Sequence, residues 1–482
     1  MIRIKEFALL LQSFVLFPWL ASASDLTITG VELVYNRDTT KDMSVKLTVQ
    51  WENAWRNEKN YDVAWIVVKF LREDDGSRHA LLAEKGHMIL RNNLADASSP
   101  VIKVPPDRTG FFIYAGVKHR GPVSWTIRIV LDPAIVAGGN FDIGNSRLAV
   151  YGIEMVHIPE GAFTLGDPDT TALQFGAFYR SGGDGKVEGL MKIISEKTPI
   201  EVGKEKGQLY YRVETPQYQG DRTGPIPADF PKGYQAFYIM KYELMQGQYA
   251  AFLNSLSREQ SQHRANFGGK SYYRLRGTIK IEDNVYMAGA PNRPCNHLSW
   301  DDGCAFADWA GLRPMTELEF TKACRGPVEA IAHEYPWGTA SKDNLARVVS
   351  ENDDLMMLHN LNESQLTNKN RDVFGVSFFW VMDLAGSLWE RVITVGHPLG
   401  RKFLGTHGDG RMTYYGFASN DDWPKGDTET GGFGFRGGGF YEHGRAYSEF
   451  NPHSPIAYRR FGAWSGGSRT EAYSCRFVRT AP

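Results

Sequence analysis

An alternation of apolar and polar side chains near the N-terminus restricts that part of the chain to β-structure. From Ser44 to Trp51 every second residue is apolar, which is the period of a strand with one buried face. The alternation returns over residues 126–131, and the apolar runs 61–70 and 110–117 are typical of central strands. Several short strands separated by turn-rich segments predict an all-β domain, an immunoglobulin-like sandwich, over residues 24–150.

Residues 1–23 have the layout of a secretory signal peptide. Arg3 and Lys5 give a positive start, residues 7–20 supply an apolar run, and residues 21–23 match a small-residue cleavage site. No later segment is long and apolar enough to span a bilayer. We therefore expect cleavage and a secreted or periplasmic protein without a membrane span, the alternative being an uncleaved N-terminal anchor.

Composition limits the classes of partner. The formal net charge of −1 at pH 7 provides no attraction for nucleic acid or for an anionic membrane surface, so neither is expected as a partner. A hydrophobic content of 42% over 482 residues is enough for a substantial core and for two or three domains.

Separated motifs occupy the rest of the chain: MVHIPEGAFTLGD at 155–167, an apolar-periodic segment at 237–256, SWDDGCAFADWAGLRPMTELEFTKACRG at 299–326, DLAGSLWE at 383–390 and GFRGGGFYEHGRAY at 434–447. In this order they resemble the formylglycine-generating-enzyme (sulfatase-modifying factor) domain, over roughly residues 151–482. The resemblance implies an α+β, C-type-lectin-like fold with two helices and a small twisted sheet. Residues 168–230 are interpreted as an insertion into that domain.

Two helices of this domain have local capping signals. Ser299 with Asp302, and Thr316 with Glu319, have the spacing of capping boxes, and Gly326 follows the second helix. Glu319 is therefore interpreted as a helix cap rather than as a catalytic base.

The reactive residues of the resembled enzymes are replaced. Those enzymes carry two cysteines, five positions apart, just after a Gly-Gly-Ser segment. They bind copper through the two thiolates and use O₂ to convert a substrate cysteine to formylglycine. Glu442 and Tyr447 stand at the corresponding positions here. Because soft sulfur ligands are what hold Cu(I), these two side chains cannot replace the thiolates, and no copper is expected.

The segment 383–390 is a candidate structural calcium site. In the resembled family this segment binds Ca²⁺, and the ligand positions correspond to Asp383, Gly386, Leu388 and Glu390. Carboxylate and backbone carbonyl oxygens of this kind suit Ca²⁺. Ser387 stands where an Asn is common in the family. From the spacing alone, an ordinary turn with solvated acidic side chains is the alternative.

A different metal is an alternative for the glycine-rich loop. Glu442, His443 and His453 lie close in sequence and supply two histidines and one carboxylate, the ligand set of many non-haem iron sites. A related branch of the superfamily, the iron-dependent sulfoxide synthases of ergothioneine assembly, uses three histidines. Its spaced His-x-x-x-His-x-Glu motif is missing here. A few loop histidines are more often polar rim residues than ligands.

The segment 433–464 has the composition of a recognition surface. Tyrosine, phenylalanine, tryptophan, arginine and histidine gather on expected surface loops, and aromatic and arginine residues are enriched at binding hot spots. Phe440 and Trp464 are expected to fill the core instead. The candidate binding residues are Tyr441, Glu442, His443, Tyr447, His453, Arg459 and Arg460. The tyrosines and arginines among them are expected to be exposed.

Four cysteines allow two disulfides in an exported chain, with three possible pairings. The resemblance favours a bond between Cys304 and Cys475, because the related enzymes join these two elements by a disulfide at nearby positions. Free buried thiols are the alternative, since cysteine is often a small core residue.

Together these features predict an exported protein that is a non-catalytic binding or structural module of the cell envelope or extracellular space. Its partner would be a protein, a peptide or a glycan. The alternative is an oxidoreductase of the sulfatase-maturation type, formylglycine-generating or dependent on non-haem iron, with altered metal ligands. The two differ in that an enzyme needs a metal or a redox residue in its cleft.

Overall fold

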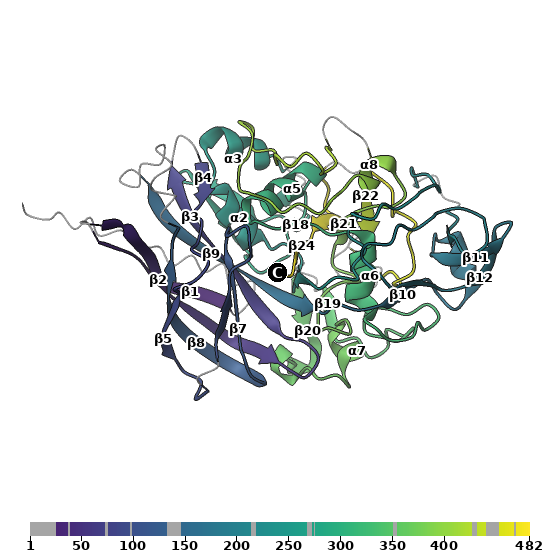
Figure 1. Ribbon diagram of the computed structural model, residues 1–482, viewed down its shortest axis with the longest axis horizontal. Coiled ribbons are helices and arrows are strands. Elements are labelled where there is room, and N and C mark those ends of the chain that lie inside the picture. Colours follow the sequence, from purple (N-terminus) through teal and green to yellow (C-terminus); the bar gives the residue numbers. More distant parts are fainter. Residues whose placement is uncertain are drawn as a thin grey trace, which may run out of the picture.

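The computed structural model describes residues 26–482 except for 37–38, 73–75, 97–98, 133–145, 214–217, 268–271, 274, 350–353, 427–430, 440–452 and 467–468. Within the described residues the chain is mixed α/β, with many strands and few, short helices (Figure 1).

The predicted alternation produces a four-stranded antiparallel sheet. Its order is β1–β2–β8–β5, made of β1 (Leu26–Asn36), β2 (Thr39–Arg56), β8 (His119–Val130) and β5 (Met88–Asn92). Val45, Leu47 and Val49 are completely buried, while the residues between them reach the surface. The prediction for this strand is confirmed.

A second sheet packs against the first and extends beyond it. Its order is β18–β24–β15–β9–β3–β7–β6, with β4 beside β3. The strands are β18 (Arg313–Pro314), β24 (Phe477–Thr480), β15 (Phe237–Met240), β9 (Arg147–Ile158), β3 (Asp62–Arg72), β7 (Phe111–Tyr114), β6 (Val101–Lys103) and β4 (Gly76–His79). Apolar side chains of β2, β8, β3 and β7 form the core between the two sheets.

Strand β9 joins the N-terminal region to the remainder of the chain. It crosses the boundary predicted at residues 150 and 151, and it pairs with β3 on one side and with β15 on the other. Met155 lies opposite Val63, and Val156 lies opposite Ile239. The two predicted domains therefore share one hydrogen-bonded sheet.

The helices lie in the C-terminal region, and both predicted capping boxes form. Ser299 Oγ accepts a hydrogen bond from the Asp302 amide at 3.1 Å, and Thr316 Oγ1 accepts one from the Glu319 amide at 3.2 Å. The helices are α2 (Gln246–Leu253), α3 (Arg258–Arg264), α5 (Trp300–Trp309), α6 (Glu317–Arg325), α7 (Arg371–Phe374) and α8 (Pro398–Arg401), with 3₁₀ turns η2 (Thr170–Gln174), η3 (Leu358–Asn360) and η4 (Glu363–Gln365).

The predicted insertion forms strands of its own. In Figure 1 two of them, β11 and β12, lie at the far end of the molecule from the N-terminal strands. The sheet β12–β11–β14 consists of β11 (Tyr179–Gly183), β12 (Lys186–Gly189) and β14 (Leu209–Tyr210), and β13 (Met191–Ile193) pairs with β10 (Phe163–Leu165).

Three small sheets complete the C-terminal region. The one that matters for the site is β22–β21–β23, formed by β22 (Phe433–Arg436), β21 (Trp389–Ile393) and β23 (Tyr473–Cys475). The other two are the pairs β16 (Ile279–Glu282) with β17 (Val285–Ala288) and β19 (Arg347–Val349) with β20 (Leu355–Met357).

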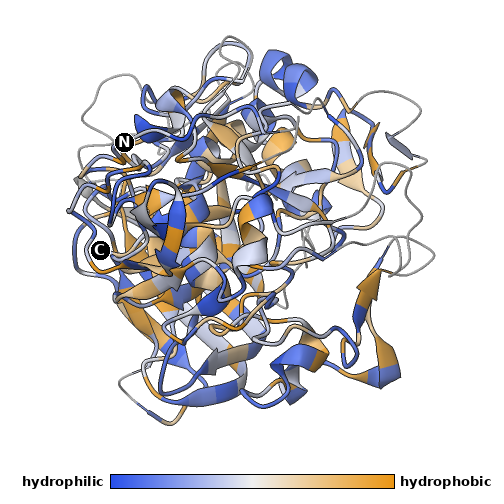
Figure 2. Cartoon of the chain, turned by 90° about the vertical axis from the view of Figure 1, so that its right-hand side faces the viewer, coloured by the Kyte–Doolittle hydropathy of each residue, from blue (hydrophilic) through white to orange (hydrophobic). Residues whose placement is uncertain are grey.

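Apolar residues gather in the interior strands and hydrophilic residues in many of the peripheral loops, as Figure 2 shows. Among the described residues, no helix has the length and apolarity that a membrane span requires.

Candidate functional site

The predicted calcium turn leads into β21 and has an unusual backbone. Asp383, Gly386 and Ser387 all adopt positive φ, at 57°, 90° and 62°. Asn enters this left-handed region more readily than Ser does, which is the physical meaning of the Ser387 departure. The Ser387 carbonyl accepts a hydrogen bond from Arg276 Nη1 at 3.3 Å, so a buried guanidinium supports the turn.

Asp383 is bound by an arginine from a neighbouring hairpin. Arg347, the first residue of β19, donates from Nε to Asp383 Oδ1 at 2.6 Å and from Nη2 to Oδ2 at 2.7 Å. The two side chains are 11% and 6% exposed. This bidentate, charge-assisted geometry uses both carboxylate oxygens.

Glu390 is bound in the same way by Arg476, from the link between β23 and β24. Arg476 Nη2 lies 2.7 Å from Glu390 Oε1, and Nε lies 2.9 Å from Oε2. The same guanidinium also donates to the carbonyls of Met240, Lys241 and Met382. Burial raises the pKa of Glu390 although Arg476 opposes the shift.

A third carboxyl group, Glu243, lies behind the turn. Its Oε1 accepts the Leu388 amide at 2.9 Å, and its Oε2 is buried without a hydrogen-bond partner. Burial first, and then repulsion from Glu390 and Asp383, raises the pKa of Glu243 well above its ordinary value. Both effects shift this side chain toward its protonated form.

In this arrangement the two predicted carboxylate ligands, Asp383 and Glu390, are not free to bind a calcium ion. Both carboxylates of the set, Asp383 and Glu390, already share their oxygens with guanidinium groups. A cation would have to displace Arg347 and Arg476 to reach them. Across the described part of the chain, no group of three or more His, Cys, Asp or Glu side chains is placed to hold a metal. Positive charge is supplied to the turn by arginine.

A small cavity lies beside this turn, lined among others by Arg347, Asp383, Ser387 and His453. Its volume of about 10 Å³ has room for about one water molecule and is too small for an organic substrate. Burial lowers the pKa of His453 to about 4, so its ring is neutral at ordinary pH, and its Nδ1 has no hydrogen-bond partner. The ring packs edge-on against Trp337, with centroids 5.7 Å apart.

The glycine run that precedes the predicted recognition loop packs directly on the turn. The Gly386 amide donates to the Gly437 carbonyl at 3.2 Å. A Cβ atom on Gly439 would lie 2.4 Å from the Leu388 carbonyl carbon, so only glycine fits there. The next residues, including the candidates Tyr441, Glu442, His443 and Tyr447, lie outside the described part of the chain.

Arg459 was predicted to be an exposed binding residue, and this is wrong. It is 1% exposed, and it donates from Nε and Nη2 to the two oxygens of Glu317 at 2.6 and 2.8 Å. Its third bond, from Nη1 to the Gly176 carbonyl at 2.9 Å, reaches the insertion. Arg460, the other predicted arginine, is exposed and packs over Phe175 at 5.3 Å.

The partner of Arg459 is a residue that sequence reasoning missed. Glu317 is completely buried at the start of α6, and it also accepts from Thr394 Oγ1 and the Val395 amide, both at 2.9 Å. Burial alone would raise its pKa, but Arg459 and Arg436 outweigh burial and leave the pKa of Glu317 below its ordinary value. No local signal pairs Glu317 with a residue so distant in the chain.

A second missed cluster joins β9, the residues that follow β15, and η4. Lys241 is buried, with Nζ 2.6 Å from Glu154 Oε1 and 3.0 Å from Glu363 Oε2. Tyr242 donates its hydroxyl to Glu363 at 2.7 Å. Buried ion pairs of this kind fix how elements meet, and their sequence signal is no more than a lysine inside an apolar strand segment.

The four cysteines are all buried and none is paired in the structure, and the Cys304–Cys475 disulfide stays a prediction. Cys475 Sγ lies against Gly303, which precedes Cys304 on α5. A Cβ atom added to Gly303 would lie 2.4 Å from Cys475 Sγ. Burial raises the pKa of the Cys475 thiol to about 12 and raises the pKa values of the other three as well. The thiols occupy the core as small apolar groups.

Comparisons with known proteins agree with the motifs. Residues 152–453, well over half of the chain, match the family model described as a sulfatase-modifying factor enzyme 1-like domain. The chain is 31% identical over 101 residues to a formylglycine-generating enzyme of Thermomonospora curvata, covering 21% of this chain and 33% of that enzyme. It is 44% identical over 52 residues to the formylglycine-generating enzyme of Streptomyces coelicolor, covering 11% and 16%.

A second group of relatives carries another name. The chain is 30% identical over 115 residues to a hercynine oxygenase of Mycobacterium tuberculosis, covering 22% of this chain and 27% of that protein. In each of these three comparisons the matched segment spans a third or less of the relative's length.

Proposed function

The chain belongs to the sulfatase-modifying factor enzyme 1-like domain family. We propose that it is a non-catalytic member of this family and acts as a binding or structural module. The observation that carries the proposal is the state of its cysteines. The sequence holds four, and each is buried as a free thiol whose pKa burial raises. Since the thiolate is the reactive and metal-binding form, chemistry based on an accessible thiolate pair has no residues to use.

The proposal extends to location and fold. The signal-peptide layout of residues 1–23 supports export to the cell envelope or the extracellular space. The two facing sheets of the N-terminal region support an immunoglobulin-like sandwich. The short helices and small sheets of the C-terminal region support a C-type-lectin-like fold.

The proposed recognition surface is the segment after β22. Its described end carries the exposed Arg460, beside Tyr458, whose ring stacks on Phe175 with centroids 4.2 Å apart. Arg459 holds this end in place through its buried bonds to Glu317. A loop anchored on a rigid scaffold is the usual setting for recognition, and a protein, a peptide or a glycan is the proposed class of partner.

A direct test asks whether the purified mature protein oxidises a thiol. A cysteine-containing peptide is incubated with the protein in air, with and without added copper or iron, and O₂ uptake and aldehyde formation are measured. The formylglycine-generating enzyme of Thermomonospora curvata serves as the positive control. We expect neither O₂ uptake nor aldehyde. Aldehyde that requires the protein would overturn the proposal.

Two observations favour a second candidate, an iron-dependent oxidoreductase. Hercynine oxygenases are among the relatives, and His453 is a neutral imidazole with an unpartnered Nδ1 beside Asp383. Elemental analysis of the purified protein separates the candidates. Stoichiometric iron that is lost in His453→Ala and retained in the exposed control His359→Ala would support the oxidoreductase. Iron-free protein that still binds its partner would support the module.

A further inference from the structure

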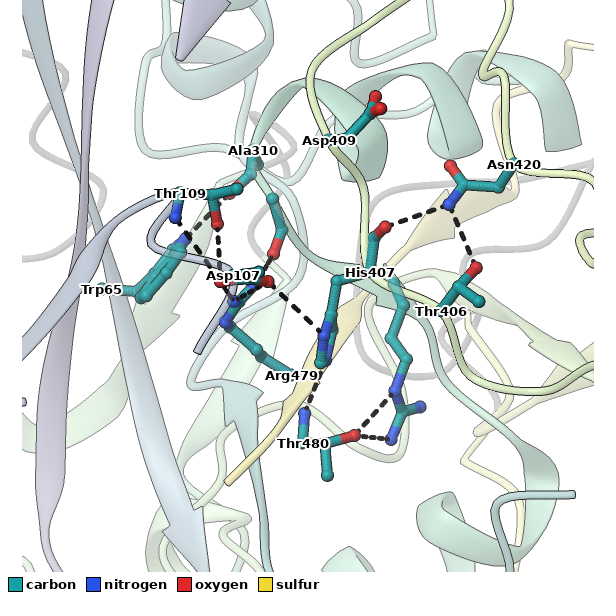
Figure 3. A network of polar contacts seen from close by, with 12 residues as sticks. Trp65, Asp107, Thr109, Ala310, Thr406, His407, Asp409, Asn420, Arg479 and Thr480 are labelled. Atoms are coloured by element: carbon teal, nitrogen blue, oxygen red, sulfur yellow. Dashed lines mark hydrogen bonds and ion pairs between the residues drawn. The ribbon is translucent and has the colours of Figure 1, made fainter. Parts of the chain in front are cut away.

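A cavity of about 440 Å³ lies where the N-terminal strands meet the C-terminal loops. This volume is within the range of small-molecule sites, and such sites are common where two parts of a chain meet. Six of its eight lining residues have polar side chains, namely Asp107, Thr109, Thr406, His407, Asp409 and Arg411. None of them lines the small cavity beside His453. Figure 3 shows most of these side chains from close by.

The N-terminal wall of the cavity is held by Asp107. Arg479, from β24, donates to Asp107 Oδ1 at 2.5 Å, and Thr109 Oγ1 donates to the same oxygen at 3.2 Å. Arg479 is 1% exposed, whereas the Asp107 side chain is 35% exposed. Asp107 is therefore fixed from behind by a buried guanidinium and keeps an accessible face.

The opposite wall is held by a buried carboxylate. Asp308, on α5, accepts the backbone amides of Asp409, Gly410 and Ser419 at 2.9, 3.0 and 3.1 Å. These bonds fix the loop that carries His407, Asp409 and Arg411 into the cavity. A loop whose backbone is fixed before binding loses less entropy when a ligand arrives.

His407 presents a single donor at the centre of this site. The backbone amide of Thr480 donates to His407 Nε2 at 3.0 Å, which makes Nε2 the acceptor and leaves the proton on Nδ1 (Figure 3). The carboxylate oxygen Asp107 Oδ2 is 3.8 Å from Nδ1, beyond hydrogen-bonding distance. Burial and the nearby Arg479 and Arg313 lower the pKa of His407, so the ring stays neutral.

The charges around the cavity balance. The carboxylates of Asp107 and Asp409 face the guanidinium groups of Arg479 and Arg411. An anion would be repelled by the two carboxylates, and a wholly apolar ligand would leave the polar side chains of the walls without hydrogen-bond partners. Across the described residues, no set of three metal-binding side chains is available for a cation. What remains is a neutral ligand with many donors and acceptors.

We propose that this cavity binds a saccharide, whose vicinal hydroxyl groups can donate to Asp107 and Asp409 and accept from His407 Nδ1 and Arg411. Each hydroxyl group has both functions, which matches a lining that mixes acceptors with donors. None of the residues that line the cavity belongs to the segment after β22, so failure of this proposal would leave the proposed function unchanged.

The experiment is ligand-observed saturation-transfer NMR on the full mature protein. The probes are D-glucose, D-galactose, N-acetyl-D-glucosamine and the β1,4-linked dimers of glucose and of N-acetylglucosamine, with inorganic phosphate as the anionic comparison. We expect at least one saccharide to bind and phosphate not to compete with it. Binding of phosphate alone, or of no saccharide in the panel, would overturn the proposal.

Three variants test whether the saccharide binds in this cavity. Asp409→Asn and Thr109→Val each remove hydrogen-bonding capacity from the wall, and each is expected to weaken binding about tenfold, as loss of one hydrogen bond to a charged or buried group does. Asp421→Asn is the matched control, because Asp421 is exposed on the same loop and does not line the cavity. Thermal melts confirm that each variant folds. Equal affinity in all three variants would show that the saccharide binds elsewhere and would overturn the proposal.

Discussion

Arg347 holds Asp383 by two hydrogen bonds, 2.6 and 2.7 Å long, at the turn where the sequence predicts a calcium ligand. The pair is nearly buried, and Glu390 at the other end of the same turn is bound by Arg476. At each carboxylate, an arginine guanidinium thus supplies the positive charge that a calcium ion would otherwise supply. The consequence for stability can be measured.

We predict that the stability of the native protein does not depend on calcium, whereas the stability of the Arg347→Met variant does. In the native protein, excess chelator should leave the melting temperature unchanged. Arg347→Met should cost about 3 kcal/mol, because removing one partner of a buried pair leaves the other charge uncompensated. Added Ca²⁺ should then restore part of the loss by binding the freed Asp383. Arg460→Met, at an exposed position, is the control, and a melting temperature that falls with chelator in the native protein would contradict the prediction.

The bond between Arg459 and Glu317 should hold the insertion in place. Arg459→Met is expected to destabilise the protein by about 3–5 kcal/mol in urea unfolding, since the buried Glu317 carboxylate would lose its bidentate arginine and keep the more distant Arg436, at 3.4 Å. Limited proteolysis should then cut within residues 168–230 first, because Arg459 also binds the Gly176 carbonyl. Adding Glu317→Gln should recover part of the loss. If Arg459→Met behaves like the exposed neighbour Arg460→Met, the anchoring role is wrong.

Because Lys69 is buried, we predict that the free energy of unfolding increases with pH. It is completely buried on β3, with Nζ 3.4 Å from His79 Nε2, and burial lowers its pKa from 10.5 to about 7, with Asp308 and Asp409 opposing the shift. Between about pH 7 and 10.5 the unfolded chain therefore holds the proton that the folded protein has lost, and stability increases with pH.

Lys69→Met should remove this increase. The difference in unfolding free energy between native and variant protein should change across that window by at most on the order of 4 kcal/mol. Urea unfolding from pH 7 to 10 measures it, with the exposed Lys85→Met as the matched control. Parallel curves for native protein and Lys69→Met would show that the lysine titrates normally.

The thiols should be inert in the folded protein. A maleimide reagent is expected to label no cysteine under native conditions and all four after denaturation in urea, because burial removes access and raises the thiol pKa. Mass spectrometry without reductant provides the second readout. Failure to label Cys304 and Cys475 after denaturation, with the mass of the intact protein lowered by two hydrogens, would instead show the disulfide.

Local sequence signals predicted the local structure well. The alternation at Val45–Trp51 lies within one strand, and the two capping boxes each join residues three positions apart, so neighbours in sequence decide them. The order of the motifs likewise identified the family. By contrast, the exposure expected for Arg459 depended on composition alone, and composition does not reveal whether a distant carboxylate will bury an arginine.

Strand periodicity, the helix ends and the family could be predicted from the sequence, because they depend on residues close together in the chain or on motifs read in order. The sequence could not show that Arg347 binds Asp383, that Arg459 binds Glu317 or that Asp107 and His407 line one cavity. These residues are far apart in sequence, and they meet because strand pairing and core packing bring their segments together. Once water is excluded, each buried carboxylate must find a partner, and packing determines which arginine is within reach.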